Sequence, residues 1–177
     1  MRRARRGRTV DDVAAWDTRR FVRRWVARTV LAAVVAPGNG VALAAELRRV
    51  GIRATELDRV DALRGGPLGA VVLAGALGGT PASALPAALA AAERVLDDGA
   101  LLLVLDAADP RLERAVAARF DVLEVRALAW RWRLQLPRLR QAGAAGVAEA
   151  VRLLRQERAA VRAGAPAGGV GLVAARR

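Results

Sequence analysis

The chain has 177 residues, 54% of them hydrophobic, so it is long and apolar enough to form one folded domain with a sizeable core. It contains no Cys, His, Lys or Tyr and a single serine, which excludes disulfides, a zinc site built on His or Cys, a His-based catalytic triad and a Schiff-base lysine. The net charge of +13 comes from arginine alone and attracts phosphates and anionic surfaces at long range.

Helices and strands alternate in the first third of the chain. Apolar residues recur with helical spacing over 10–28 and 41–50, and Gly51 follows the second of these helices as expected of a C-terminal glycine. Short β-rich runs occupy 29–35 and 52–57. The order helix, strand, helix, strand is therefore predicted up to residue 57.

The middle of the chain continues the alternation. A continuous apolar run at 68–73, bounded by glycines, predicts a strand buried on both faces. Thr80 and Pro81 are typical of an N-cap and a first helical position, and the helix that they open is expected to stop at 97–99. A second buried strand is predicted at 100–105.

Asp109 and Pro110 predict another helix start. A further helix is expected near 144–162, followed by a flexible turn and a last strand at 170–175. The helix after Pro110 is expected to turn three apolar residues inward, Leu112, Val116 and Phe120.

Residues 128–136 alternate apolar and polar side chains, which predicts a strand with one buried face. Trp130 and Trp132 would lie on that face as core residues, with an interface to a second copy of the chain or a substrate-stacking role left open. Arg131 and Arg133 would lie on the opposite face, in solvent.

This order of elements predicts an α/β fold: a doubly wound, mostly parallel sheet with helices on both faces and an antiparallel C-terminal edge strand. Residues 1–28 would form a basic N-terminal arm and an amphipathic helix. Residues 29–177 would form the Rossmann-like domain, with an inserted helix at about 140–163.

A glycine pair at the first strand-to-helix junction is the most informative local feature. Gly38 and Gly40 follow the strand, and the next strand ends on Asp58, an arrangement that holds nucleotide-like cofactors through bare backbone, a helix N-terminus and a ribose-binding acid. A tight turn and an ordinary solvated acid remain the alternative. Leu43 occupies the third glycine position of a nicotinamide-binding fingerprint, which disfavours that cofactor.

In these motifs the chain resembles the class I S-adenosylmethionine-dependent methyltransferases, particularly the small bacterial kind. The resemblance covers roughly residues 29–136 and the last ten. The matching segments are the loop 36–40, the strand 69–75, the turn and strand 94–103, and the terminal strand 171–176. Two acids also match: Asp58, eighteen residues after Gly40, and Asp61, which precedes an Ala-Leu pair.

The resemblance implies S-adenosylmethionine as cofactor and methyl transfer to a small-molecule oxygen or nitrogen acceptor. No metal is implied and no catalytic residue is identified. The segment 74–77 lacks the Asn/Asp-Pro-Pro-aromatic motif, and no Cys is present, so nucleic-acid bases are disfavoured as acceptors. By this resemblance the cofactor-binding residues are Ala36, Gly38, Asn39, Gly40, Asp58, Asp61 and Ala74.

Three departures from the family pattern favour an alternative function. Val34 and Val35 stand where the family has an acid that contacts the methionine part of the cofactor, and Ala36 replaces the first glycine. Only nine residues separate Asp58 from Leu68, too few for the helix and third strand that normally intervene. The alternative is a non-catalytic, methyltransferase-like interaction or regulatory protein that has lost cofactor binding.

The arginines are spread over the whole chain without any lysine, which indicates the coding bias of a GC-rich genome and a solvated basic surface. A nucleic-acid partner is left open but not favoured, since basic charge alone gives non-specific attraction. Acids at 11–17 replace the apolar core of a secretory signal, and prolines interrupt the uncharged stretch 65–92, so no membrane segment and a cytoplasmic location are expected.

Overall fold

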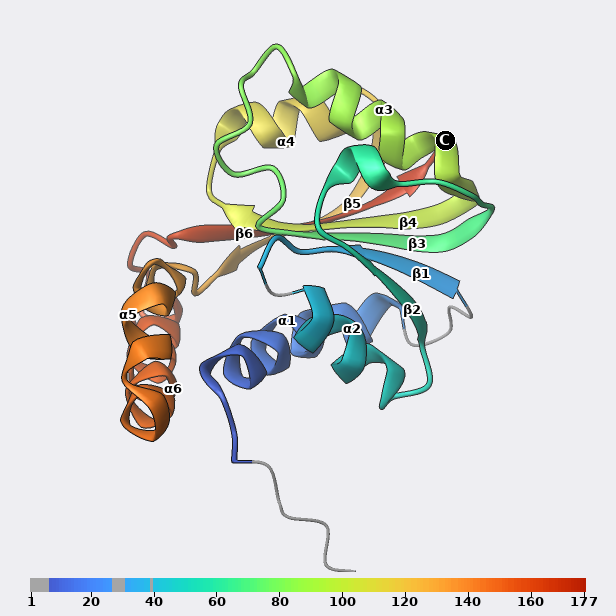
Figure 1. Cartoon of the computed structure of the whole chain (residues 1–177). Coiled ribbons are helices and arrows are strands. Elements are labelled where there is room, and N and C mark those ends of the chain that lie inside the picture. The colour runs from blue at the N-terminus through green and yellow to red at the C-terminus, as the bar shows by residue number, and fades with distance from the viewer. Residues whose placement is uncertain (1–6, 27–30, 39) are drawn as a thin grey trace, which may run out of the picture.

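The computed structural model of the chain describes residues 7–26, 31–38 and 40–177, and the strands in these ranges form one six-stranded sheet (Figure 1). The strand order is β2-β1-β3-β4-β6-β5. The first four strands are mutually parallel where they pair, and β6 lies antiparallel between β4 and β5. The strands are β1 (Leu31–Val35), β2 (Arg53–Leu57), β3 (Leu68–Ala74), β4 (Leu96–Ala107), β5 (Phe120–Leu128) and β6 (Gly169–Arg176).

Helices cover both faces of this sheet. Figure 1 shows α1 and α2 against one face, α3 and α4 against the other, and the α5–α6 pair beside the edge where the parallel strands end. The predicted doubly wound α/β fold, with an antiparallel C-terminal part, is therefore confirmed. The helices are α1 (Val10–Val26), α2 (Gly40–Arg48), α3 (Leu85–Val95), α4 (Pro110–Ala117), α5 (Leu136–Gln141) and α6 (Gly143–Arg162), with 3₁₀ turns η1 (Val60–Ala62) and η2 (Arg131–Gln135).

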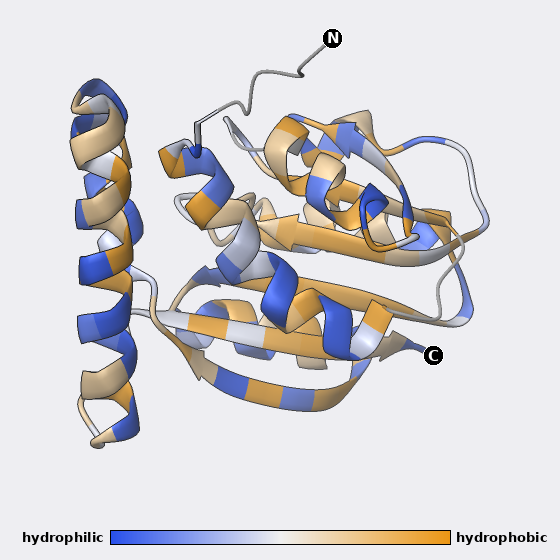
Figure 2. Ribbon diagram, turned by 90° about the horizontal axis from the view of Figure 1, so that it is seen from below, coloured by the Kyte–Doolittle hydropathy of each residue, from blue (hydrophilic) through white to orange (hydrophobic). Residues whose placement is uncertain are grey.

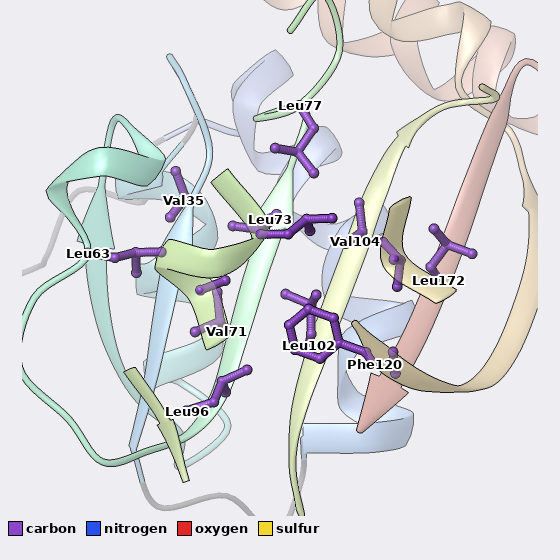
Figure 3. Close-up of a cluster of buried hydrophobic side chains, with 14 of the residues drawn as sticks. Val35, Leu63, Val71, Leu73, Leu77, Leu96, Leu102, Val104, Phe120 and Leu172 are labelled. Atoms are coloured by element: carbon purple, nitrogen blue, oxygen red, sulfur yellow. The ribbon is translucent and has the colours of Figure 1, made fainter. Parts of the chain in front are cut away.

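The central strands supply side chains to both layers, as their continuous apolar sequences predict. Val71 and Leu102 enter the core under α3 and α4, whereas Val72 and Leu103 enter the core under α1 and α2 (Figure 3 shows the first cluster). All four side chains are fully buried. Each contributes about 1.5–3 kcal/mol by leaving water, so β3 and β4 fix the centre of the molecule.

The helix predicted over 10–28 is confirmed as α1 within the described residues. Phe21, Val22 and Val26 are buried against the sheet, while Arg20 and Arg23 are exposed. Figure 2, seen from the side of α1 and α2, shows hydrophilic stretches on the outer surface of these helices. No helix in the described ranges is both long and apolar enough to cross a bilayer.

The predicted boundaries of α3 are wrong at both ends. Thr80 does not cap a helix: its backbone N–H donates to the Leu77 carbonyl in a turn, and α3 begins at Leu85. At the other end Leu96 already pairs with Leu68 in the sheet, so the helix stops before 97–99. Thr80 and Pro81 thus belong to the turns that precede the helix and not to its first residues.

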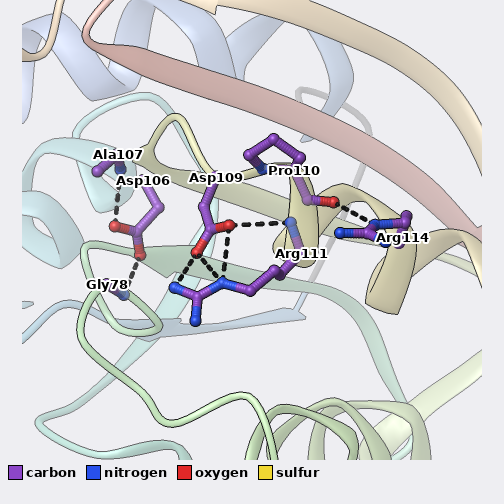
Figure 4. Close-up of polar contacts among 7 residues, drawn as sticks. All are labelled: Gly78, Asp106, Ala107, Asp109, Pro110, Arg111 and Arg114. Carbon is purple, nitrogen blue, oxygen red and sulfur yellow. Dashed lines mark hydrogen bonds and ion pairs between the residues drawn. The ribbon is translucent and has the colours of Figure 1, made fainter.

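The predicted start of α4 is confirmed, because Asp109 is the N-cap and its carboxylate accepts a hydrogen bond of 2.9 Å from the Arg111 backbone N–H (Figure 4). Phe120, expected on the inner side of this helix, is instead the first residue of β5. Its side chain is nevertheless buried in the same core layer as Leu112 and Val116.

The strand predicted over 128–136 is wrong. The Glu157 carboxylate accepts hydrogen bonds of 2.8–3.0 Å from three consecutive backbone N–H groups, at Trp130, Arg131 and Trp132. Those donors are therefore unavailable to a neighbouring strand, and the segment forms η2. The edge strand on the antiparallel side of the sheet is instead β5, whose side chains are mostly exposed.

Candidate functional site

The carboxyl ends of β1, β2 and β3 meet at one edge of the sheet. Val35 pairs with Leu57 on one side and with Leu73 on the other, so the residues that follow these three emerge side by side. Ala36 and Asp58 are two of them, and the Ala36 backbone N–H donates to the Leu57 carbonyl at 3.2 Å. The structure thus brings the glycine loop and the predicted acid together.

The glycine loop lies at the surface, and the Gly38 carbonyl accepts a hydrogen bond of 3.4 Å from Arg140 Nη2. Gly38 is exposed, has a φ of +70°, and would meet no heavy atom within 4 Å if it carried a Cβ. Gly40 is the first residue of α2, whose unpaired backbone N–H groups favour a polar or anionic ligand. Asn39 lies outside the described residues.

The two predicted acids differ in whether their carboxylates already have a partner. Asp58 is exposed, and among the described residues no hydrogen bond or ion pair engages its carboxylate. Asp61, at η1, is held by the Arg59 guanidinium, whose Nε lies 3.0 Å from Oδ1. Asp58 can therefore accept ligand hydroxyls without first losing a partner, whereas Asp61 must release Arg59.

Asp106, which the sequence analysis did not single out, fixes the loop after β3. Its carboxylate is buried at the end of β4 and accepts hydrogen bonds from the backbone N–H groups of Leu77, Gly78 and Ala107 at 3.0, 2.8 and 2.8 Å. Figure 4 shows the bonds from Gly78 and Ala107. Ala74 is half-buried at the start of this loop. In the sequence, the position of Asp106 directly after the apolar run 100–105 could have pointed to this role.

A second buried polar cluster lies between α1, η2 and α6. Arg133 leaves only 9% of its side chain exposed and Asp17 only 12%, with 3.7 Å between Arg133 Nη2 and Asp17 Oδ2. Arg158 donates to the other oxygen of Asp17, and Arg133 Nη2 also donates to the Thr18 hydroxyl at 2.6 Å. The prediction that Arg133 faces solvent is therefore wrong.

Burial sets the electrostatics of this cluster. Removal from water raises the pKa of Asp17, although the guanidiniums of Arg133 and Arg158 act in the opposite direction. Removal from water also lowers the pKa of Arg133, with Asp17 opposing. Burying either charge alone would therefore be costly, and each of the two groups stabilises the charged form of the other.

Trp130 connects this cluster to the carboxyl end of β3. Arg133 stacks on the Trp130 ring with its guanidinium carbon 4.4 Å from the ring centroid. The ring also lies 3.7 Å from the position that a Cβ of Gly75 would take, just after β3. A cavity of about 330 Å³ opens beside Trp130, between α1, the end of β5 and α6.

Neither a protein-family model nor a curated protein matches the chain, but solved structures do. The StiE O-MT structure has a TM-score of 0.52 at 14% identity, covering 93% of this chain and 75% of that one. N-methyltransferase NodS of Bradyrhizobium japonicum WM9, in complex with S-adenosylhomocysteine, has a TM-score of 0.52 at 10% identity, covering 94% and 87%.

A third match is phosphoethanolamine N-methyltransferase 2 of Haemonchus contortus in complex with S-adenosylmethionine. It has a TM-score of 0.53 at 12% identity, and the match covers 96% of this chain but 38% of that one. Together with the sheet order and the helices on both faces, these matches show that the chain has a class I methyltransferase-like fold.

Proposed function

We propose that the chain binds S-adenosylmethionine across the carboxyl edge of β1, β2 and β3 and transfers its methyl group to a small-molecule oxygen or nitrogen acceptor. The observation that carries the proposal is the exposed, unpaired carboxylate of Asp58 beside the strand end that leads into the glycine loop. The similar structures include both O- and N-methyltransferases, which supports the reaction class.

Each residue at the edge has a definite task in this proposal. The Asp58 carboxylate accepts hydrogen bonds from the two ribose hydroxyls, and the backbone at Gly38 and Gly40 faces the amino-acid part of the cofactor. Ala36, which is buried, follows β1, and Ala74, which is half-buried, ends β3, both with small side chains. Asn39 and Asp61 remain predicted contacts, Asp61 on the adenine side.

The bound cofactor would supply a methyl group already activated on a sulfonium. The protein then has to align the acceptor and exclude water, a contribution of about 7–11 kcal/mol in well-oriented reactions. A strong base is not needed for an acceptor that is itself nucleophilic. This suits the chain, which lacks His, Cys, Lys and Tyr and whose buried acids Asp17 and Asp106 already have partners.

One observation favours a cofactor-free interaction protein as the second candidate. Val34 and Val35 are fully buried and apolar where the resemblance places an acid, so no carboxylate meets the methionine part of the cofactor there. The connection from Asp58 to Leu68 contains only η1, as its length predicts. Such a protein would keep the fold and bind neither S-adenosylmethionine nor S-adenosylhomocysteine.

Calorimetric titration separates the two candidates. The chain should bind both ligands with micromolar affinity, and Asp58→Ala should weaken binding at least about tenfold, or 1.4 kcal/mol, because a charge-assisted hydrogen bond is lost. Asp97→Ala is the matched control, because Asp97 is also an exposed acid but lies at the start of β4, at the opposite edge of the sheet. Absence of binding at millimolar ligand would establish the non-catalytic alternative.

A further inference from the structure

The cavity beside Trp130 is lined by an excess of positive charge. It has a volume of about 330 Å³ and lies between α1, the carboxyl end of β5, η2 and α6. Its arginines exceed its carboxylates by four. The charged residues that line it are Arg20, Arg126, Arg133, Arg158, Arg162 and Asp17.

The outer arginines of this cavity have no acidic partner. All 17 acidic residues of the chain lie in the described ranges, and none of the ion pairs there involves Arg20, Arg126 or Arg162. The single carboxylate, Asp17, is shared by the two inner arginines. Like charges around a concave, partly dry space repel one another, so the cavity concentrates a positive potential that an anion would relieve.

The inner wall also contains an unused donor. Arg133 Nε is buried and has no acceptor among the described residues, although Nη2 of the same side chain is fully engaged. A buried donor without a partner is rare in folded proteins. Trp130 and Phe21 complete the wall with apolar surface.

We propose that this cavity binds a small organic anion through its carboxylate or phosphate, with the apolar body of the ligand against Trp130. A cavity of about 330 Å³ is within the size range of small-molecule sites and is too small for a nucleic-acid strand. The arginines at the mouth recruit the anion, and the forked guanidiniums suit both kinds of oxyanion.

The place of the cavity identifies the anion as the methyl acceptor, a step that rests on the proposed function. Leu105 lines the cavity and pairs with Ala74, and Trp130 lies against Gly75. Both contacts place the cavity beside the carboxyl end of β3, one of the three strand ends at which the cofactor is proposed to bind. An acceptor anchored by its anionic group at the arginines would thus direct its other end toward that edge.

Calorimetry with phenyl phosphate, phenylacetate and neutral benzyl alcohol, in 0.15 M salt and without cofactor, tests the site. Both anions should bind at least about tenfold more tightly than the alcohol, and the tighter of the two identifies the oxyanion. Arg126→Gln and Arg162→Gln, which change exposed side chains, should each weaken anion binding about tenfold. Arg152→Gln is the control, since it removes the same charge from α6 outside the cavity.

Equal weakening by Arg162→Gln and Arg152→Gln would overturn the inference, because it would show non-specific attraction by a basic surface. Anions that bind no better than benzyl alcohol would do the same, as would retention of an oligonucleotide, but not of phenyl phosphate, that depends on Arg126 and Arg162. If the anions bind as expected and S-adenosylhomocysteine does not, the anion site stands and the proposed methyl transfer fails.

Discussion

Replacing Asp17 by alanine should lower the free energy of unfolding by about 3–5 kcal/mol, because the buried guanidinium of Arg133 would lose its counter-charge. The same carboxylate accepts from Arg158, so the substitution also loosens α6 from α1. Urea denaturation of the two proteins measures the difference, with the slope of the transition as a check that both unfold in one step.

Two further variants make the result specific to this buried pair. Asp121→Ala removes an acid from an exposed ion pair with Arg177 and should cost no more than about 1 kcal/mol. Arg133→Met, added to Asp17→Ala, should restore part of the lost stability because it removes the uncompensated charge. A loss no greater than that of Asp121→Ala would contradict the description of the pair.

Asp106→Ala is expected to cost roughly 1–3 kcal/mol, because it leaves the buried Leu77 backbone N–H without its acceptor and removes the acceptor of the more exposed N–H groups of Gly78 and Ala107. Asp106→Asn keeps one acceptor oxygen and should be less destabilising. Since Asp106 holds the loop that follows Ala74, the asparagine variant should also weaken S-adenosylhomocysteine binding. Chemical denaturation and calorimetry give the two quantities.

Asp109→Ala is the comparison for Asp106. It removes a carboxylate three residues along the chain that caps α4 and pairs with Arg111 at the surface, and it should destabilise the chain less than Asp106→Ala does. If Asp106→Ala unfolds no more easily than Asp109→Ala, the loop after β3 does not depend on the buried carboxylate.

The main features of the candidate site could be predicted from the sequence because they depend on local patterns and on one general rule. The glycines at 38 and 40 and the acid at 58 each follow a predicted strand, and the carboxyl ends of neighbouring parallel strands share an edge. The structure places β1 beside β2, which brings Ala36, at the start of the glycine loop, next to the strand that ends before Asp58. Whether they hold the cofactor stays a prediction.

The segment 128–136 shows why alternation alone could not predict structure there. Trp130 and Trp132 are buried, as expected, but the Glu157 carboxylate, 25 residues or more away, takes the backbone donors that a strand would need. The edge strand β5 shows no regular alternation of apolar and polar residues, and Val122, Leu123 and Val125 are apolar yet exposed. Both outcomes depend on contacts that are remote in the sequence.

Arg133 was missed for a related reason. Its position in the alternating pattern predicts exposure, yet Asp17 and Thr18, more than a hundred residues earlier, provide the charge and hydroxyl that allow its burial. No local signal marks such a partner. The cavity that depends on this pair was for that reason absent from the sequence-based site.

A crystal structure of the chain with S-adenosylhomocysteine tests the central claim most directly. The account predicts the ribose hydroxyls within about 3 Å of the Asp58 carboxylate, with the rest of the ligand along the loop at Gly38 and Gly40. A ligand bound elsewhere, such as in the arginine-lined cavity, or no bound ligand in crystals soaked at millimolar concentration, would contradict it.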